Sequence, residues 1–573
     1  MLVYRDAERR LDTFGEIARL DRLLQGVAEG GEAREAATEI LIDLGALEAA
    51  AVDALNPDQD GFGASERAWR EASLEAGRLF LHARDAEPGR ARASAQAARR
   101  ALARVRASRP PPSLAVRTPE GYAWYALYPD LYAEAARRFA ASSAPLPAVA
   151  VGLRGIGTSL SAVVVAALER EGRAIDSLTL RPRGHPYERT PRLDARLRGA
   201  LRAQAEAGAW FLIVDEGPGL SGSSFCGTAE ALARLGAGDE QIVLFPSVET
   251  DGAGFRSETA RARWKRHRRV HVSFEAARAD LAPATLAARD VSGGLWREVV
   301  FGGETRPPVA PQHERRKYLS ADGEVLMRYA GLGRDGRQKL DRAGRLAEAG
   351  FAAEPVSFAD GFLATRFVEG RPMRRRDRDA GFTARAAAYV GWLGVSARTG
   401  QAVEGGELFA MVTRNVELSL GEQGLRRLTR LDGWRPRLAG AAQVAIDGRM
   451  APHEWIAGPR GVLKTDALDH GDDHFLPGAT DIAWDVAGFA TEWGLSEAET
   501  TAFAEEVGRL AGDSRLAERL PFYDTAYLAF RTGWTHLSAS GLPEGPDRRG
   551  LRLQERRYRA RLDRSLDRLA ALS

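Results

Sequence analysis

The sequence contains very little cysteine and has no long apolar run. Cys226 is the single cysteine among 573 residues, which excludes an intramolecular disulfide framework and favours a reducing compartment. No stretch approaches the roughly 18 apolar residues of a membrane span, and the opening residues MLVYRDAERRLD contain no apolar signal region. The sequence therefore predicts a cytoplasmic protein without a membrane partner.

Lysine is also scarce, since it occurs only at Lys265, Lys317, Lys339 and Lys464 while arginine supplies the other basic residues. The formal net charge of +3 is too small to predict nucleic-acid binding, so we expect no nucleic-acid partner. Hydrophobic residues at 44% and charged residues at 28% are ordinary globular values. At roughly 150 residues per domain, the length predicts about three or four domains, and it leaves an oligomer open.

Proline and glycine clusters divide the chain. Apolar residues at helical spacing in 16–29 and 35–55 predict a helical segment over residues 1–110, which the prolines of RASRPPPSL end. Short apolar runs then alternate with helical stretches, which predicts a Rossmann-like parallel sheet with crossover helices over 111–302. A linker follows at 303–313. Residues 314–573 then begin with a hairpin about Asp322-Gly323. The expected class is a multidomain α/β protein with an α+β C-terminal domain.

The stretch IVDEGPGLSGSSF, residues 213–225, carries a buried strand into two carboxylates and then into a loop with little side-chain bulk. Ligands bind at the carboxyl ends of parallel strands, and a helix N-terminus holds phosphate through backbone N–H groups. Asp215 and Glu216 would accept hydrogen bonds from sugar hydroxyls, whereas the loop after them would hold a phosphate. The pattern predicts a site for a phosphorylated ribose. The alternative is a plain strand-to-helix turn with acidic surface residues.

These residues resemble the phosphoribosyl diphosphate signature of type I phosphoribosyltransferases. Residues 151–168, VGLRGIGTSLSAVVVAAL, are similar to the diphosphate loop of that family, and RPRGHPYER at 181–189 adds three arginines and a histidine. Two features depart from the family pattern, because the loop after the acids is a residue longer and contains Pro218. The match covers about a third of the chain, residues 112–300.

The resemblance implies transfer of a phosphoribosyl group from phosphoribosyl diphosphate to a base or small nucleophile, with Mg²⁺ as cofactor. It implies catalytic roles for Asp215, Glu216 and Arg154. The residues it implies for binding are Gly155, Gly157, Thr158, Ser159, Arg181, Arg183, His185, Arg189, Gly219, Leu220, Ser221, Gly222, Ser223 and Ser224. The rival hypothesis is a sensor that binds phosphoribosyl diphosphate without turning it over.

The C-terminal part concentrates acids and histidines between residues 466 and 485. This span indicates either a metal or phosphoryl-transfer site or a solvated acidic turn with helix-capping aspartates. It resembles aminoglycoside phosphotransferase and choline-kinase-like proteins, in which case the kinase-like domain would cover 314–573 and bind ATP. The resemblance implies Asp466 as catalytic base, and Asp481 with Asp473 as metal ligands. Arg328 stands where those kinases place a lysine, and it is expected with Lys464 at the ATP site.

Overall fold

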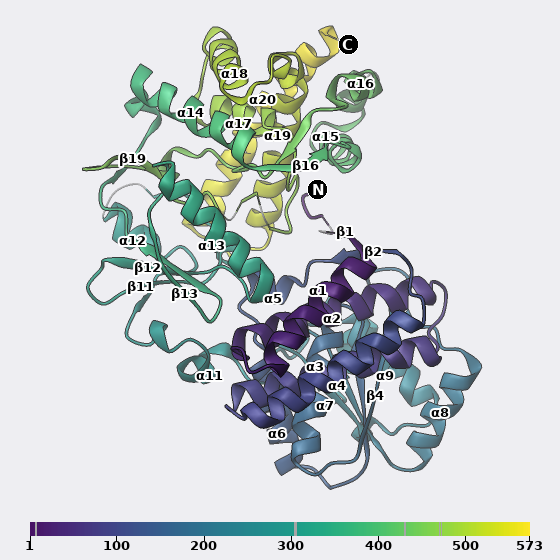
Figure 1. Ribbon diagram of the computed structural model, residues 1–573. Helices are drawn as coiled ribbons and strands as arrows, with labels where there is room; N and C mark the ends of the chain where they lie inside the picture. The colour runs from purple at the N-terminus through teal and green to yellow at the C-terminus, as the bar shows by residue number, and fades with distance from the viewer. Residues whose placement is uncertain (6–7, 303–305, 429–430, 469, 472, 573) are drawn as a thin grey trace.

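The computed structural model describes residues 1–5, 8–302, 306–428, 431–468, 470–471 and 473–572. Two bodies lie one above the other in Figure 1, and the chain crosses between them more than once. The lower body holds a parallel sheet and the upper body is mostly helical, with an antiparallel sheet beside it. The fold is therefore mixed α/β with a parallel sheet, as the sequence predicts at this level.

The first helices form a bundle that covers the lower body. Asp12 caps the first of them by accepting hydrogen bonds from the backbone N–H groups of Phe14 and Gly15. A two-stranded antiparallel pair frames the bundle. The elements are β1 (Glu8–Asp12), α1 (Thr13–Ala28), α2 (Arg34–Leu55), α3 (Ala64–Arg84), α4 (Pro88–Ala107) and β2 (Ser113–Arg117).

The parallel sheet has the strand order β4-β3-β7-β8-β9, with every neighbouring pair parallel. The order reverses between β3 and β7, which makes their carboxyl ends the topological switch point where ligands bind in such sheets. Its strands are β3 (Ala148–Leu153), β4 (Ile175–Leu180), β7 (Trp210–Val214), β8 (Ile242–Phe245) and β9 (Arg268–Arg269). The short β5 (Pro182–Arg183) and β6 (Thr190–Pro191) form a separate antiparallel pair.

Helices cover both faces of this sheet because its strands are apolar on both sides. Leu212 and Val214 face a core that contains α6 (Pro129–Ala141) and α7 (Gly157–Arg170). Phe211 and Ile213 face the opposite core. The helices on that side are α8 (Ala195–Glu206), α9 (Ser223–Arg234) and α10 (Glu258–Trp264). The bundle α1–α4 packs outside α7, so it continues the first core rather than forming one of its own.

A five-stranded antiparallel sheet with the order β10-β11-β12-β14-β13 begins the second half of the chain. Gly323, with a φ of +77°, turns β11 into β12, which confirms the predicted hairpin. The elements are β10 (Arg289–Asp290), β11 (Lys317–Leu319), β12 (Val325–Tyr329), α13 (Gly333–Glu348), β13 (Pro355–Ala359) and β14 (Phe362–Arg366). Strand β10 lies before the predicted linker at 303–313, so this sheet draws on residues from both sides of it.

In the described part of the chain, seven α-helices and short strands build the rest of the upper body around a second large core. The helices are α14 (Ala380–Ser396), α15 (Gly406–Arg427), α16 (Arg435–Leu438), α17 (Ala483–Trp493), α18 (Glu497–Ala511), α19 (Leu516–Ser540) and α20 (Pro546–Ala571). The strands are β15 (Arg371–Pro372), β16 (Arg398–Ala402), β17 (Ala442–Val444), β18 (Trp455–Gly458) and β19 (Gly461–Lys464). Val3 is buried in this core, so the N-terminal residues belong to the upper body.

The described residues include three further short helices, α5 (Glu120–Trp124), α11 (Phe274–Leu281) and α12 (Trp296–Phe301), of which α12 lies beside the antiparallel sheet in Figure 1. None of the helices in the described ranges is both long enough and apolar enough to span a membrane.

Buried charge fixes the helical bundle to the parallel sheet. Arg70 of α3 is 2% exposed and donates to Glu48 of α2 at 3.3 Å. Its guanidinium also donates to the Thr158 carbonyl at 2.9 Å and to the Ser161 hydroxyl at 2.9 Å, both at the start of α7. A buried charge needs such partners, so the first helices cannot leave α7 without exposing or orphaning them.

Replacing Arg70 by Met should therefore lower the free energy of unfolding by about 3–5 kcal/mol, because Glu48 is left buried without its cation. Adding Glu48→Gln to Arg70→Met should recover part of the loss. Urea denaturation followed by circular dichroism measures both changes. Arg202→Met, at an exposed position of α8, is the matched control. Equal stability of Arg70→Met and Arg202→Met would show that the Arg70 pair does not join the two layers.

Candidate functional sites

A cavity of about 1550 Å³ opens at the carboxyl ends of β3 and β7, and we name it the sheet-edge cavity. The lower body, including Asp53 of α2, supplies most of its wall, and Arg316, directly before β11, borders it as well. The predicted residues that line it are Arg154, Gly155, Ser159, Arg181, Asp215, Glu216, Gly219 and Leu220. The two loops that the sequence singled out thus meet at the switch point of the sheet.

The loops after β3 and β7 touch through Gly157 and Asp215. A Cβ atom on Gly157 would lie 3.1 Å from the Asp215 Oδ1 atom, so glycine permits this approach. The Asp215 carboxylate accepts from the Glu216 N–H group at 2.9 Å and from the Gly157 N–H group. Burial raises the pKa of Asp215 to about 7 against these hydrogen bonds and the charge of Arg181.

Glu216 lies beside two other carboxylates. Burial, followed by the charges of Asp215 and Glu120, raises the pKa of Glu216 to about 8. Its side chain accepts from the Gly121 N–H group, and a Cβ atom on Gly121 would lie 2.7 Å from the Glu216 Oε1 atom. Near neutral pH the sheet-edge cavity therefore holds carboxyl groups that both donate and accept hydrogen bonds, as sugar hydroxyls require.

The predicted hydroxyl donors are largely used inside their own loops. Ser221 Oγ accepts from the Ser223 N–H group at 3.2 Å, and Ser223 Oγ donates to the Pro186 carbonyl at 2.8 Å. Ser224 lies in the first turn of α9 and its carbonyl accepts from the Thr228 hydroxyl. Gly222, with a φ of +66°, precedes α9 against the ring of Phe255. None of these four loop residues, 221–224, borders the sheet-edge cavity, whereas Gly219 and Leu220 do.

Two predicted donors at the start of α7 are buried, and the hydroxyl of Thr158 has no hydrogen-bond partner among the described residues. Thr158 is fully buried and its carbonyl accepts from Arg70. Ser159 Oγ lies 2.9 Å from the hydroxyl of Tyr122 and donates to the Ile156 carbonyl at 3.0 Å. Gly155 differs, since a Cβ atom there would meet no atom within 4 Å. The open part of the predicted diphosphate loop is therefore its glycine turn.

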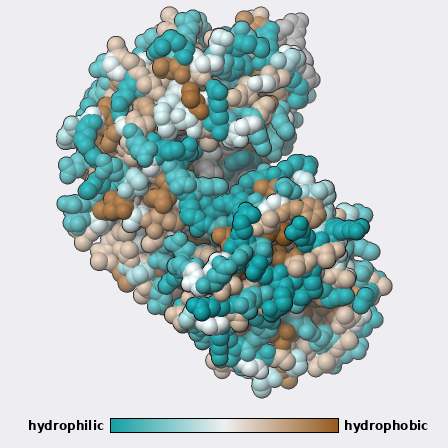
Figure 2. All heavy atoms as spheres, in the orientation of Figure 1, coloured by the Kyte–Doolittle hydropathy of each residue, from teal (hydrophilic) through white to brown (hydrophobic). Residues whose placement is uncertain are grey.

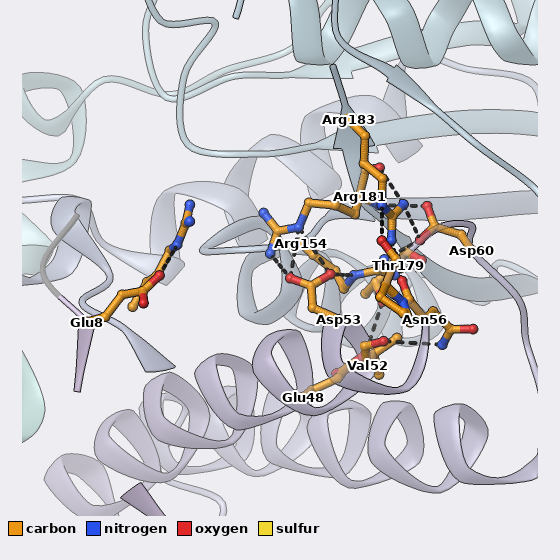
Figure 3. Close-up of polar contacts among 12 residues, drawn as sticks. Glu8, Glu48, Val52, Asp53, Asn56, Asp60, Arg154, Thr179, Arg181 and Arg183 are labelled. Atoms are coloured by element: carbon orange, nitrogen blue, oxygen red, sulfur yellow. Dashed lines mark hydrogen bonds and ion pairs between the residues drawn. The ribbon is translucent and has the colours of Figure 1, made fainter. Parts of the chain in front are cut away.

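The predicted diphosphate arginines bind carboxylates of the N-terminal segment (Figure 3). Arg154 Nε donates to Asp53 at 2.7 Å, and its Nη2 donates to Asp60. Arg181 donates to Asp53 at 2.9 Å, and Arg183 donates to Asp60 at 2.9 Å. The side chains of Arg154 and Asp60 are both 0% exposed. The guanidinium of Arg154 is therefore held by two protein carboxylates and by the Thr179 carbonyl at 3.1 Å, partners that the sequence interpretation did not include.

The last two predicted residues of this stretch lie on the turn between β5 and β6. His185 packs 5.3 Å from the ring of Tyr187. Arg189 is close enough for its charge to lower the pKa of Asp215 slightly against the larger effect of burial. Neither side chain lines the sheet-edge cavity.

A second cavity, of about 280 Å³, lies between the antiparallel sheet and the helical body, and we name it the interlobe cleft. Leu319 and Leu326 from the sheet and Ile456 from β18 form apolar walls. Trp296 of α12 lies 6.1 Å from the stacked ring of His453 at one side. Figure 2 shows the upper body, which supplies most of these walls, and a hollow that separates it from the lower body. An apolar cleft with a few polar groups is the usual form of a small-molecule site.

Asp466 is the centre of the polar part of the interlobe cleft. It follows β19 and accepts from Arg328 Nη1 at 3.0 Å, with Lys317 Nζ at 3.9 Å and His470 Nε2 at 3.3 Å. Burial alone would raise the pKa of Asp466, but Lys317, His470 and Arg328 together hold it well below its usual range. The carboxylate is therefore ionised, and it draws together cations from β11 and β12.

Lys464 is fully buried beside this group. Its Nζ donates to Glu454 at 3.0 Å and lies 3.2 Å from Asp447. These two carboxylates raise the pKa of Lys464 although burial opposes them. Asp447 also accepts from the hydroxyl of Tyr389 at 2.6 Å. The predicted ATP residue Lys464 does border the cleft, but its charge is already shared between two acids.

Glu454, Asp466 and His470 can offer ligand atoms that all lie within 4.8 Å of one another, the one such group found among the described residues. Carboxylate oxygens suit Mg²⁺, so Glu454 and Asp466 fit that ion, whereas an imidazole is an unusual ligand for it. Sequence reasoning did not select Glu454 or Asp447. For Glu454 the available signal was its place directly before β18, whereas Asp447 lies further upstream and has no such signal.

The predicted metal ligands Asp481 and Asp473 lie apart. Asp481 is 1% exposed and its oxygens accept from Arg519 at 2.5 and 3.2 Å, away from the residues that line the interlobe cleft. Asp473 does line the cleft, and burial raises its pKa to about 7 against the charge of Arg315. Asp469 and Asp472, which belong to the predicted acid cluster, lie outside the described residues.

Helix α5 and the residue after it lie between the two cavities. Tyr125 lines both, and its hydroxyl lies 2.8 Å from His474 Nδ1. Tyr122 accepts at its carbonyl from the hydroxyl of Tyr329 in β12 at 2.6 Å, while its own hydroxyl reaches Ser159. Glu120 approaches Glu216 closely enough to raise its pKa. One short helix thus contacts the acids of one cavity and the sheet that borders the other.

Comparisons with known proteins give structural likenesses only. No family model and no curated protein matches the chain. Among solved structures, it resembles a choline/ethanolamine kinase family protein from Mesorhizobium loti, with 19% identity and a TM-score of 0.33 over 46% of this chain and 93% of that one. It resembles choline kinase LicA from Streptococcus pneumoniae, with 13% identity and a TM-score of 0.33 over 51% and 99% of the two chains. It also resembles an ethanolamine kinase from Plasmodium vivax, with 11% identity and a TM-score of 0.33 over 54% of this chain and 90% of that one.

The raised pKa values at the sheet-edge cavity predict a pH-dependent stability. Asp215 and Glu216 have folded pKa values of about 7 and about 8, above the unfolded values of roughly 3.9 and 4.3. Stability should therefore fall as pH rises from about 5 to about 8, because the folded state resists deprotonation. Glu216→Gln should exceed the wild type by about 1–3 kcal/mol at pH 8 and match it near pH 4.

Urea unfolding curves across this pH range measure the difference. Glu206→Gln, an exposed carboxylate on α8, should keep the wild-type pH dependence. If Glu216→Gln follows the same pH slope as the wild type, Glu216 does not titrate in that range.

Proposed function

We propose that the protein is a small-molecule phosphotransferase that uses a nucleoside triphosphate such as ATP in the interlobe cleft. The observation that carries this proposal is the convergence of Lys317, Arg328 and Asp466 in an enclosed cleft with apolar walls. Phosphoryl transfer needs cations at the phosphate oxygens and a carboxylate-held metal, with an apolar surface for the base. The cleft supplies side chains of each kind.

Arg328 and Lys317 are the residues we assign to the triphosphate. Both are on adjacent antiparallel strands, where Lys317 is the direct partner of Arg328 across the β11–β12 pair. A guanidinium binds phosphate oxygens in a bidentate way, so Arg328 can serve where the resembling kinases use a lysine. Their present contact with Asp466 places the two cations beside the group that would carry the metal.

Glu454 and Asp466 are the residues that would hold Mg²⁺, which would neutralise phosphate charge when bound. This assignment changes the predicted role of Asp466. A carboxylate held ionised by three cations is a weak proton acceptor, whereas a catalytic base works best with a pKa near the operating pH. Asp473, whose pKa is about 7, meets that condition and lies in the same cleft. We therefore assign to Asp473 the role of catalytic base, which accepts the proton of the acceptor hydroxyl.

Asp466→Asn should weaken Mg²⁺-dependent ATP binding by at least about tenfold, about 1.4 kcal/mol, because a carboxylate ligand is lost. Arg328→Ala should weaken ATP binding to a similar extent with and without Mg²⁺. Titration calorimetry on the full chain measures both. Asp341→Asn, at an exposed position of α13, is the control. Wild-type affinity in both cleft variants would place the nucleotide elsewhere or exclude it.

A second candidate function belongs to the sheet-edge cavity: phosphoribosyl transfer from phosphoribosyl diphosphate to a base or small nucleophile. The meeting of Gly155, Asp215 and Gly219 at the switch point favours it. In this reaction the anomeric carbon forms a bond to the nucleophile while its bond to the diphosphate oxygen breaks. The acids would hold the ribose hydroxyls, and Mg²⁺ is the expected cofactor. Its non-catalytic alternative is a sensor for the same ligand.

The double variant Asp215→Asn with Glu216→Gln should bind phosphoribosyl diphosphate at least about tenfold more weakly than the wild type, since neutral amides replace the groups assigned to the ribose. Calorimetry in the presence of Mg²⁺ reports this, with Asp280→Asn as an exposed control on α11. An unchanged affinity in the double variant would remove Asp215 and Glu216 from the ribose site.

Release of diphosphate separates enzyme from sensor. Wild-type protein incubated with phosphoribosyl diphosphate and a panel of purines, pyrimidines and amines should release diphosphate only with a suitable acceptor. Binding without release across the panel would favour the sensor.

A further inference from the structure

We propose that Asp53 is a tethered anion that sets the affinity of the sheet-edge cavity for phosphate groups, and that an incoming diphosphate displaces it from Arg181. This inference rests on the second proposed function, because it concerns the anion end of that cavity. The ligand class is a diphosphate or phosphate ester. Asp53 belongs to the N-terminal helices rather than to the parallel sheet.

The position of Asp53 is that of a bound anion. Its Oδ1 atom accepts from Arg154 Nε at 2.7 Å, and its Oδ2 atom accepts from Arg181 Nε at 2.9 Å and from Arg181 Nη2. All three residues line the sheet-edge cavity, next to the open turn at Gly155. Figure 3 shows the carboxylate between the two guanidinium groups, above the end of α2. A forked guanidinium binds carboxylate and phosphate oxygens with the same geometry, so the two anions compete for it.

The two acids of this cluster differ in how firmly they are held. Asp60 is 0% exposed and accepts from Arg154, from Arg183 at 2.9 Å and from the Arg181 N–H group at 2.8 Å. Asp53 is 31% exposed and Arg181 is 25% exposed. If Asp53 leaves, Arg154 keeps Asp60 as its counter-charge, so the buried guanidinium is not orphaned. Arg181 can then turn its donors to a ligand.

The helix itself favours release of Asp53. This residue lies in the last turn of α2, which ends at Leu55 and has no basic residue in that turn. The carbonyl end of a helix repels a carboxylate, so the arginines must hold Asp53 in place. A competing anion removes that attraction, and the exposed side of the carboxylate can turn to solvent.

A tethered competitor lowers the apparent affinity for the free ligand, because only the displaced state binds. Asp53→Asn keeps the shape of the side chain and removes the charge. We expect this variant to bind inorganic diphosphate about tenfold or more tightly than the wild type. Asp58→Asn removes the same charge from an exposed position in the following loop and should bind like the wild type, which separates displacement from a general charge effect.

The test is titration calorimetry of the full chain with inorganic diphosphate, at constant ionic strength, for wild type, Asp53→Asn and Asp58→Asn. Equal affinity in the wild type and Asp53→Asn, or weaker binding in Asp53→Asn, would overturn the inference and leave the phosphoribosyl site standing. No binding by any of the three at millimolar diphosphate would overturn the phosphoribosyl function and this inference together.

Hydrogen exchange on wild-type protein gives a second measurement that needs no variant. Millimolar diphosphate should raise the exchange rate of amides in residues 50–60, because the end of α2 loses its arginine contacts. Slower or unchanged exchange there, with diphosphate bound, would show that Asp53 stays on the arginines and would overturn the inference.

Discussion

The buried guanidinium of Arg154 is the constraint on which the lower body depends. Its side chain is 0% exposed, and burying such a charge is unfavourable unless carboxylates accompany it. The parallel sheet carries the arginine, but both acids come from the N-terminal segment. The arginine therefore lacks its counter-charges unless the N-terminal segment packs against the parallel sheet. This explains why the first helices share a core with α7 instead of folding as a separate unit.

The same principle organises the upper body. Lys464, Asp447 and Glu454 form a buried charged group, and Asp481 pairs with Arg519 on α19. Beside them Asp466, whose side chain is 22% exposed, gathers cations from two strands of the antiparallel sheet at the edge of the interlobe cleft. We interpret the fully buried pairs as structural and the group at the cleft as the chemistry-bearing one, since a ligand can exchange only with partners it can reach.

Local sequence patterns predicted the elements of this protein that consecutive residues form. Strand, loop and helix follow one another along residues 148–170 and 210–234, so the sequence placed both loops correctly at one end of a sheet. It also gave the hairpin at Gly323. It did not reveal that Asp53 reaches Arg181, or that Asp481 reaches Arg519, because these pairs form only after distant segments pack. A single sequence does not show which acid each arginine will contact. An arginine that binds a ligand and an arginine in a structural ion pair therefore cannot be told apart at that stage.

Strand β10 has a consequence for how the chain can be divided. It precedes the proline-rich segment that looks like a boundary, yet it forms the outermost strand beside β11. A polypeptide starting at residue 314 would lack it and would present the backbone N–H and C=O groups of β11 to solvent. Unprotected edges of that kind recruit strands from other molecules, so such a fragment would tend to self-associate. A fragment that starts at or before residue 289 would retain this protective strand. The boundary between the two parts of the protein therefore does not coincide with the proline-rich segment that the sequence suggests.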